Sequence, residues 1–437
     1  MRIASNAMMK MPSIKLSDTW VRQQLIQRLP ATEKLRASFK NALKGYRSIA
    51  ELLSSALFPS ALTLAVSTKL VAGAVRAVIS EDKTLFNHSK ILESRGLSST
   101  ARNLKAVIDR LPDFQAFVYA TDEFYRDHIE HQIRVAVLGD FLLSQHFGYD
   151  HDRLSLSERI CSITGLTEEN VLKAWWIASL FHDVGIPIAK LSKNMNDFVN
   201  DLAMVYGNLN LKLPPIGSLI IDENRNRVMF EALTTGFSRL IIKKFRIALG
   251  WDGTPIVNHG ALSALLVLNS IPELGGVESD KLKERFEEDY RAYLIAARAM
   301  MLHDLYQDNN RIEIHSHRDP IAYLLVCCDE MQEWNRDVSM KRRSVFDPRY
   351  SIVQLMDHCI MDISDNGIEF TAEYRNQEAK DSCGFIFDYC LSEKSRDLVR
   401  LRDANHIFPK LTMNFVDYVF QAHRLLGKVQ KTVCTNI

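Results

Sequence analysis

Five apolar segments of helix length, between residues 122 and 336, most constrain what this chain can fold into. In the first of them, Val135, Leu138 and Leu142 follow one another at three- and four-residue steps, the spacing of a buried helix face. Each segment also carries one or two side chains that can ligate a metal: His131, His182 with Asp183, His259, His303 and Asp329. A buried carboxylate without a partner is costly, and one divalent cation would compensate several of these groups together.

The stretch SLFHDVGIPIAK, residues 179–190, places two of these groups where an apolar helix ends. We expect Gly185 to stop the helix in a left-handed backbone conformation, and Pro187 to prevent its continuation. A buried helix tip would present His182 and Asp183 rigidly to a metal ion.

Short motifs surround the candidate ligands. H-x-x-R-V occurs at His131–Val135, HD-x-G at His182–Gly185 and H-G-x-x-S-A at His259–Ala264. The order H…HD…H…H…D on five apolar helices resembles the HD-domain metal-dependent phosphohydrolase superfamily, over about residues 120–340. This resemblance implies a mainly α fold with an HD-domain helical core.

The resemblance also implies two divalent metal ions. The first would be held by His131, His182, Asp183 and Asp329, and the second by Asp183 as a bridge together with His259 and His303. Mixed imidazole and carboxylate ligands suit Mn, Fe, Ni, Co or Zn better than calcium; Mg is also open, and the sequence does not choose among them. A metal-activated hydroxide would attack phosphorus, which makes Asp183 a catalytic residue.

Further residues are candidates for contact with the substrate. His317, in the loop IHSHRDP before the last apolar helix, is a candidate general acid, and its neighbour Arg318 a substrate contact. Arg134, close to the first ligand in sequence, and Arg336 are two further substrate-binding candidates. Lys190 is the nearest lysine after the HD-x-G motif.

The sequence departs from many two-metal members of this superfamily at two places. Ile186 stands where they carry the lysine of HD-x-G-K, and no G-Y-P motif follows His303. Both departures weaken the case for a cyclic-dinucleotide phosphodiesterase. We therefore expect a phosphohydrolase that cleaves a nucleotide phosphoester or phosphoanhydride, with a preference for a deoxynucleoside triphosphate or related nucleotide. A cyclic-nucleotide phosphodiesterase, a di-iron oxygenase and a non-hydrolytic nucleotide sensor remain the alternatives.

Several polar and aromatic residues near the motifs have simpler interpretations. Trp175 and Trp176 are expected in the core rather than as a base-stacking platform. Asp304, directly after His303, could orient a histidine ligand from behind. His128 is expected to be structural, and His146 to face solvent after its helix.

Composition narrows the class of partner. The net charge is +1, so there is no strong nucleic-acid signal, and seven cysteines without a C-x-x-C pair suit reduced thiols in a cytoplasmic protein. The most apolar early segment, residues 52–68, contains Pro59 and is short for a membrane span. It is expected to form a buried helix pair, with membrane contact or a partner-binding face as alternatives. The sequence is also compatible with a homo-oligomer.

Three regions are expected along the chain: a helical N-terminal lobe at 1–95, the HD-type domain at 96–345 and a small α+β appendage at 346–437. In the appendage, Asp365-Asn366-Gly367 separates two strand-like runs and predicts a hairpin. A charged helix is expected at about 392–403, followed by a strand in LTMNFVDYVF.

Overall fold

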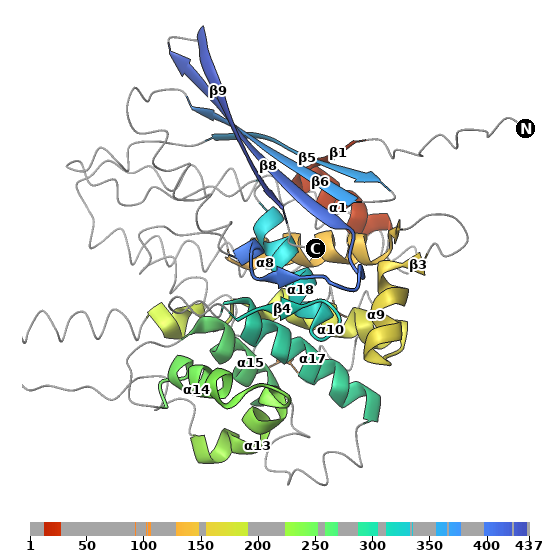
Figure 1. Cartoon of the computed structure of the whole chain (residues 1–437), viewed down its shortest axis with the longest axis vertical. Coiled ribbons are helices and arrows are strands. Elements are labelled where there is room, and N and C mark those ends of the chain that lie inside the picture. The colour runs from red at the N-terminus through yellow and green to blue at the C-terminus, as the bar shows by residue number, and fades with distance from the viewer. Residues whose placement is uncertain are drawn as a thin grey trace, which may run out of the picture.

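The protein is described by a computed structural model, and helices dominate it, with a smaller sheet on one side (Figure 1). The residues that the structure describes are 13–27, 92, 102, 104–105, 128–147, 154–190, 223–251, 258–269, 287–304, 312–332, 334, 355–364, 367–376, 397–421 and 424–434. The mainly α prediction is confirmed at this level.

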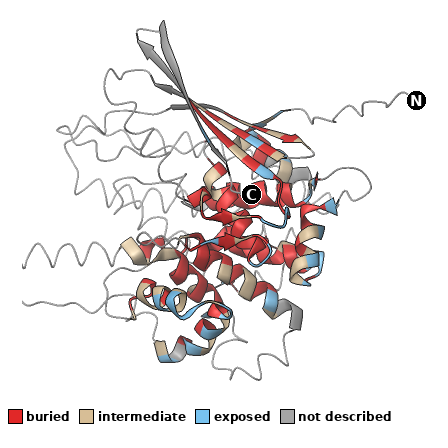
Figure 2. Cartoon of the chain, in the orientation of Figure 1, coloured by how far each residue is buried: buried red, intermediate tan, exposed pale blue. Residues whose placement is uncertain are grey.

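All five predicted apolar segments are helical. They form α8 (His128–Leu143), α10 (Glu168–Phe181), α15 (His259–Asn269), α17 (Glu287–His303) and α18 (Pro320–Met331). Four further helices are α1 (Asp18–Gln27), α9 (Leu156–Thr164), α13 (Glu223–Thr234) and α14 (Arg239–Ala248). Helix α10 runs through the middle and contacts α8, α9, α17 and α18. Figure 2 shows that the helices around it are largely buried.

Local sequence explains how α10 begins and packs. The Thr167 hydroxyl caps its N-terminus by accepting a hydrogen bond from the Asn170 backbone N–H. Trp175 is fully buried and donates its indole N–H to the Ala136 carbonyl of α8 at 2.8 Å. A Cβ at Gly139 would lie 1.9 Å from the Trp175 ring, so only glycine allows the two helices to approach so closely. The prediction that Trp175 belongs to the core is confirmed, as it is for Trp176, which is 1% exposed.

The sheet has five strands in the order β1-β5-β6-β8-β9. Their bounds are β1 Ile14–Leu16, β5 Leu355–Ser364, β6 Gly367–Asn376, β8 Lys410–Gln421 and β9 Arg424–Cys434. Strands β6 and β8 are parallel, and the other pairs are antiparallel. Alternate residues of β6, namely Ile368, Phe370 and Ala372, are buried, so one face of the sheet closes the same core as the helices.

The predicted hairpin is confirmed, because β5 and β6 are antiparallel with Ser364 opposite Gly367. The predicted strand in LTMNFVDYVF is also confirmed as part of β8. A helix was expected at about 392–403, and this expectation is wrong for the last residues of that range. Residues 401–402 form strand β7, which pairs in parallel with β4 (Ile314–His315), because the backbone hydrogen bonds of this segment go to the chain before α18.

The N-terminal part contributes to both layers. Strand β1 pairs with β5 of the sheet, and α1 then packs against α8. The ring of Trp20 in α1 meets the rings of Phe141 and Trp334 edge-on. Most of the expected lobe at 1–95, including 52–68, lies outside the described residues. Within the described ranges, no helix is both long and apolar enough to cross a membrane.

Candidate metal centre

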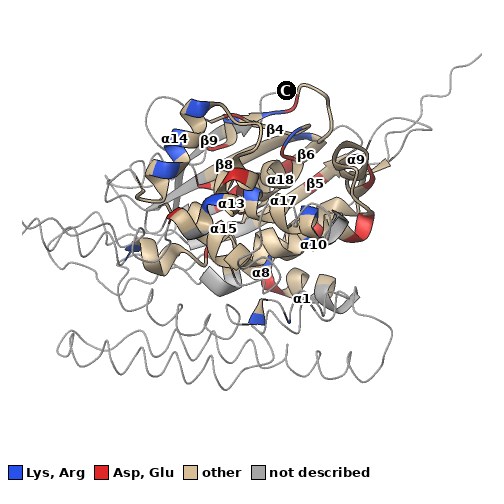
Figure 3. Ribbon diagram, turned by 90° about the horizontal axis from the view of Figure 1, so that it is seen from below, with Lys and Arg blue, Asp and Glu red and all other residues tan. Residues whose placement is uncertain are grey.

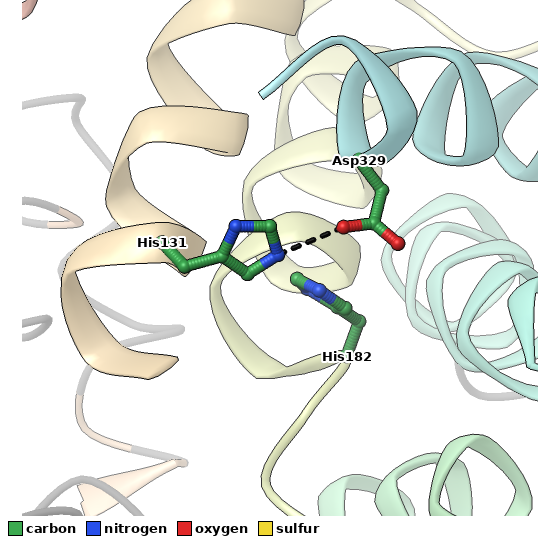
Figure 4. Close-up of side chains that lie close together, drawn as sticks. All are labelled: His131, His182 and Asp329. Atoms are coloured by element: carbon green, nitrogen blue, oxygen red, sulfur yellow. Dashed lines mark ion pairs between the residues drawn. The ribbon is translucent and has the colours of Figure 1, made fainter. Parts of the chain in front are cut away.

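Six side chains from five helices converge at the buried end of α10. Figure 4 shows His131, His182 and Asp329 pointing toward one another from α8, α10 and α18. The Nε2 atom of His131 lies 2.8 Å from Asp329 Oδ1. Two groups of ligand atoms, each within 4.8 Å of one another, could hold a metal ion: His131, His182 and Asp329 form one, and His182, Asp183 and His303 the other.

Asp183 lies between the two sets of imidazoles. Its Oδ2 atom is 3.4 Å from His182 Nε2 and 4.0 Å from His131 Nε2. Its Oδ1 atom is 3.3 Å from His259 Nε2 and 3.8 Å from His303 Nε2. Ligands that share one metal at about 2.1 Å lie roughly 3–4 Å apart, so these separations suit a shared ion. His182 is close to both sets, since its ring centroid is 5.4 Å from that of His131 and 5.0 Å from that of His303.

Each of the four histidines has an oxygen acceptor behind it, at Nδ1. These acceptors are the side-chain oxygen of Gln332 for His131 at 2.5 Å, the Ser179 carbonyl for His182 at 2.9 Å, the Asp304 carboxylate for His259 at 2.5 Å and the Met300 carbonyl for His303 at 2.5 Å. An oxygen acceptor at Nδ1 places the ring proton there, which leaves the Nε2 lone pair directed at the centre. This is the arrangement in which histidine binds a metal.

The Gln332 side chain fixes the tautomer of His131 most clearly. Its amide NH₂ donates to the Trp334 carbonyl at 2.7 Å, so its oxygen must face His131. Gln332 itself is completely buried. A fully buried amide with both ends satisfied holds the imidazole in one orientation.

The pKa values of two histidines of the cluster are shifted in opposite directions. Burial lowers the pKa of His182 to about 4, so this ring is neutral at pH 7. Its Nε2 atom is buried and has no hydrogen-bond partner among the described residues. For His259, burial acts to lower the pKa, but the carboxylates of Asp304 and Asp183 outweigh it and raise the pKa to about 10. A positive charge, either a proton or a metal ion in its place, is therefore stabilised between these carboxylates.

The side chains of the cluster are not equally buried, so one side of it is closer to solvent than the other. The side chains of His182 and His303 are 0% and 4% exposed, whereas those of Asp329 and His259 are each 25% exposed. A molecule arriving from solvent would therefore meet the cluster from the side of Asp329 and His259.

Two glycines allow the helices that carry the candidate ligands to meet. A Cβ at Gly260 would lie 2.4 Å from the Met300 carbonyl, and one at Gly185 would lie 2.3 Å from the His259 carbonyl. The expectation that Gly185 stops α10 in a left-handed conformation is wrong, because its φ is not positive. Its lack of a side chain instead admits the start of α15, and its N–H donates to the Ser263 hydroxyl at 2.8 Å.

Two of the predicted substrate contacts, Arg134 and Arg318, have partners elsewhere in the protein. Arg134 is buried and forms a two-bond ion pair with Asp18 of α1, at 2.8 and 3.1 Å. His317 and Arg318 are exposed and precede α18, whereas Asp329 lies near the other end of that helix, nine residues after Pro320. At 1.5 Å per residue, Pro320 and Asp329 are about 14 Å apart along the helix, and the role of His317 as general acid stays a prediction.

The other contacts are placed as follows. Arg318 packs over the Phe237 ring at 4.7 Å and donates to the Gly236 carbonyl. Lys190 ends the helical turn that follows Gly185 and is partly exposed, so its role in binding substrate stays a prediction. Arg336 lies outside the described residues.

Figure 3 shows that lysine and arginine gather on α14, which carries four basic residues and no acidic one.

Sequence reasoning anticipated one of the supporting residues. Asp304 does hold His259 from behind, as expected for the residue that follows His303. The role of Gln332 was missed, although its place three residues after Asp329, one helical turn on, puts it on the same side of α18. The expected exposure of His146 is confirmed, whereas the side chain of His128 lies outside the described residues.

No family model matches this sequence, and neither curated proteins nor solved structures gave a match. The geometry of the cluster therefore carries the functional argument by itself.

Proposed function

We propose that this chain is a metal-dependent phosphohydrolase that cleaves a phosphoester or phosphoanhydride bond of a nucleotide. The observation that carries the proposal is the set of four histidines whose Nδ1 atoms are all held by acceptors while their Nε2 atoms converge on Asp183. The order of these ligands along the chain also resembles that of the HD-domain phosphohydrolases. The choice of a nucleotide, with a preference for a deoxynucleoside triphosphate, rests on that resemblance.

The donor set suits two divalent ions. His131, His182, Asp329 and Oδ2 of Asp183 would hold one, while His259, His303 and Oδ1 of Asp183 would hold the other. Ions held there would supply Lewis-acid chemistry, lowering the pKa of water and neutralising charge on phosphate oxygens.

The protein's own residues would orient the ligands, keep water from the inner side and leave the outer side accessible. Gln332 and Asp304 orient the rings of His131 and His259 through hydrogen bonds, so the ligands need no reorganisation when an ion enters. Burial of His182 keeps that ring neutral and excludes water from the inner side of the cluster. The partly exposed side chains of Asp329 and His259 leave the outer side open to a phosphate group.

The test is hydrolysis of a nucleotide panel by purified protein loaded with Mn, Co, Ni, Mg, Zn or Fe, with phosphate, pyrophosphate and triphosphate measured separately. We expect turnover on at least one nucleotide, and its loss in His182→Ala and Asp183→Ala, with helical content retained. Arg227→Met is a matched control, since Arg227 and its partner Glu231 are both exposed.

Each alternative function has its own outcome. Metal binding with oxygen-dependent product formation, and only with iron, would support the di-iron oxygenase. Tight nucleotide binding without turnover would support the sensor. Turnover of cyclic nucleotides alone would support the phosphodiesterase. Any of these results would overturn the proposed preference for linear nucleotides or the hydrolytic reaction itself.

A further inference from the structure

Arg400 is a buried arginine that comes from the chain after β6 and reaches the end of a ligand-bearing helix. It is 2% exposed. Its Nη2 atom donates to the His303 carbonyl at 2.8 Å, and its Nη1 atom to the Leu302 carbonyl at 3.4 Å. These two carbonyls belong to the last turn of α17.

A buried guanidinium needs compensating hydrogen bonds and charges, because removing its charge from water costs several kcal/mol. The last carbonyls of a helix have no partner inside the helix, and they form the negative end of its dipole. Arg400 supplies donors and a positive charge to that end together. Asp397, whose Oδ1 lies 3.3 Å from Nη2, balances the charge.

The segment around Arg400 is itself firmly held. The Arg400 carbonyl accepts from the Ile314 N–H at 3.0 Å, and the Arg402 carbonyl accepts from the Ser316 N–H at 2.9 Å. The buried Asp403 carboxylate accepts from the Ser316 hydroxyl and from the Phe408 backbone N–H. The Arg400 head group is therefore presented from a fixed backbone.

His303 is the residue that this contact fixes. It is the last residue of α17, and its ring is already tied to Met300 through Nδ1. The hydrogen bond from Arg400 to the His303 carbonyl holds the peptide from which that ring extends. Ends of helices fray unless they are capped, so this hydrogen bond would keep Nε2 of His303 aimed at Asp183.

We propose that Arg400 is a positioning residue for the second metal ion, and that through it the segment at 397–408 is coupled to the metal centre. This inference rests on the proposed function, since it concerns one of the two ions assigned there. It predicts that Arg400 affects the ion at His303 and His259 while the ion at His131 and Asp329 is spared.

The test is a titration of the metal-stripped chain with Mn²⁺. Binding is measured in two ways, as the heat released in calorimetry and as the concentration of free Mn²⁺ from its electron paramagnetic resonance signal. We expect the wild type to bind two ions. Arg400→Met should bind the first ion normally and the second at least about tenfold more weakly, as loss of a supporting hydrogen bond does at other metal sites. Arg400→Lys, which keeps the charge and one donor, should restore part of the affinity, and Arg227→Met, at an exposed ion pair with Glu231, should match the wild type.

The outcomes separate this inference from the proposed function. A wild type that binds no Mn²⁺ would contradict the metal centre itself. A wild type that binds two ions, alongside an Arg400→Met variant that binds both equally well, would overturn only the role of Arg400. If Arg400→Met fails to fold by circular dichroism, Arg400→Lys carries the test: a weakened second ion supports the inference, and two unchanged ions refute it.

Discussion

The side-chain oxygen of Gln332 offers the sharpest test of how the proposed first ion would be held. Replacing Gln332 with leucine keeps much of the volume but removes the acceptor for His131 Nδ1 and the donor for the Trp334 carbonyl. Each buried group left without its partner costs about 1–3 kcal/mol. The His131 ring is then free to rotate or change tautomer, which at other metal sites lowers affinity about 10- to 100-fold, or about 1.4–2.7 kcal/mol.

The assay is the same Mn²⁺ titration, with thermal unfolding of each variant measured alongside. Gln332→Leu should weaken the first ion and leave the second, which is the mirror image of the pattern expected for Arg400→Met. Gln332→Glu keeps the acceptor for Nδ1 but loses the donor to the Trp334 carbonyl, so it should retain more affinity for the first ion than Gln332→Leu while lowering the stability of the fold. Gln145→Leu is the matched control: Gln145 follows α8, and within the described residues its side chain donates to the Phe141 carbonyl and the Ser144 hydroxyl.

Unchanged affinity for both ions in folded Gln332→Leu would refute this reasoning. It would mean that the 2.5 Å contact to His131 does not select the tautomer that binds metal. Equal weakening of both ions would also count against it, since that pattern belongs to general loosening of the core.

Three other perturbations have expected outcomes. Gly185→Ala places a Cβ 2.3 Å from a backbone carbonyl of α15, so we expect a loss of about 1–3 kcal/mol in urea unfolding; unchanged stability would show that α15 can shift freely. Burial raises the pKa of the Cys327 and Cys328 thiols, so neither should react with a thiol reagent at pH 8 until the protein unfolds, and rapid labelling of the native state would contradict their placement. Arg134→Met leaves the Asp18 carboxylate without its buried partner, and we expect destabilisation of about 3–5 kcal/mol by chemical denaturation, whereas a loss under about 1 kcal/mol would show that the pair contributes little.

The helical core could be predicted from sequence because its signals are local. Apolar steps of three and four residues mark α8 and α10 directly, and a polar residue in such a helix stands out. The candidate ligands could be named because they stand out in or beside such helices: His131 and Asp329 lie within them, and the others lie at helix ends. The hairpin of β5 and β6 was predictable from its turn residues in the same way.

What failed in sequence reasoning depends on contacts between distant segments. Nothing in the local sequence shows that Arg134 meets Asp18, 116 positions earlier, or that β7 pairs with β4. A charged run at 392–403 satisfies a helical pattern, yet the parallel partner strand decides its structure at 401–402. His317 precedes α18 and Asp329 lies near the other end of that helix, so nearness in sequence alone does not place the two side chains together.

Metal content of the purified protein tests the central claim most directly. Elemental analysis of the wild type, loaded with Mn, Co or Fe and then freed of loose ions, should give about two ions per chain if the cluster holds the expected pair. Asp183→Ala, which removes the oxygens facing all four imidazoles, should lose most of this metal while its circular dichroism keeps the helical signal. A wild type without metal under every loading condition, or an Asp183→Ala variant with full occupancy, would contradict the account.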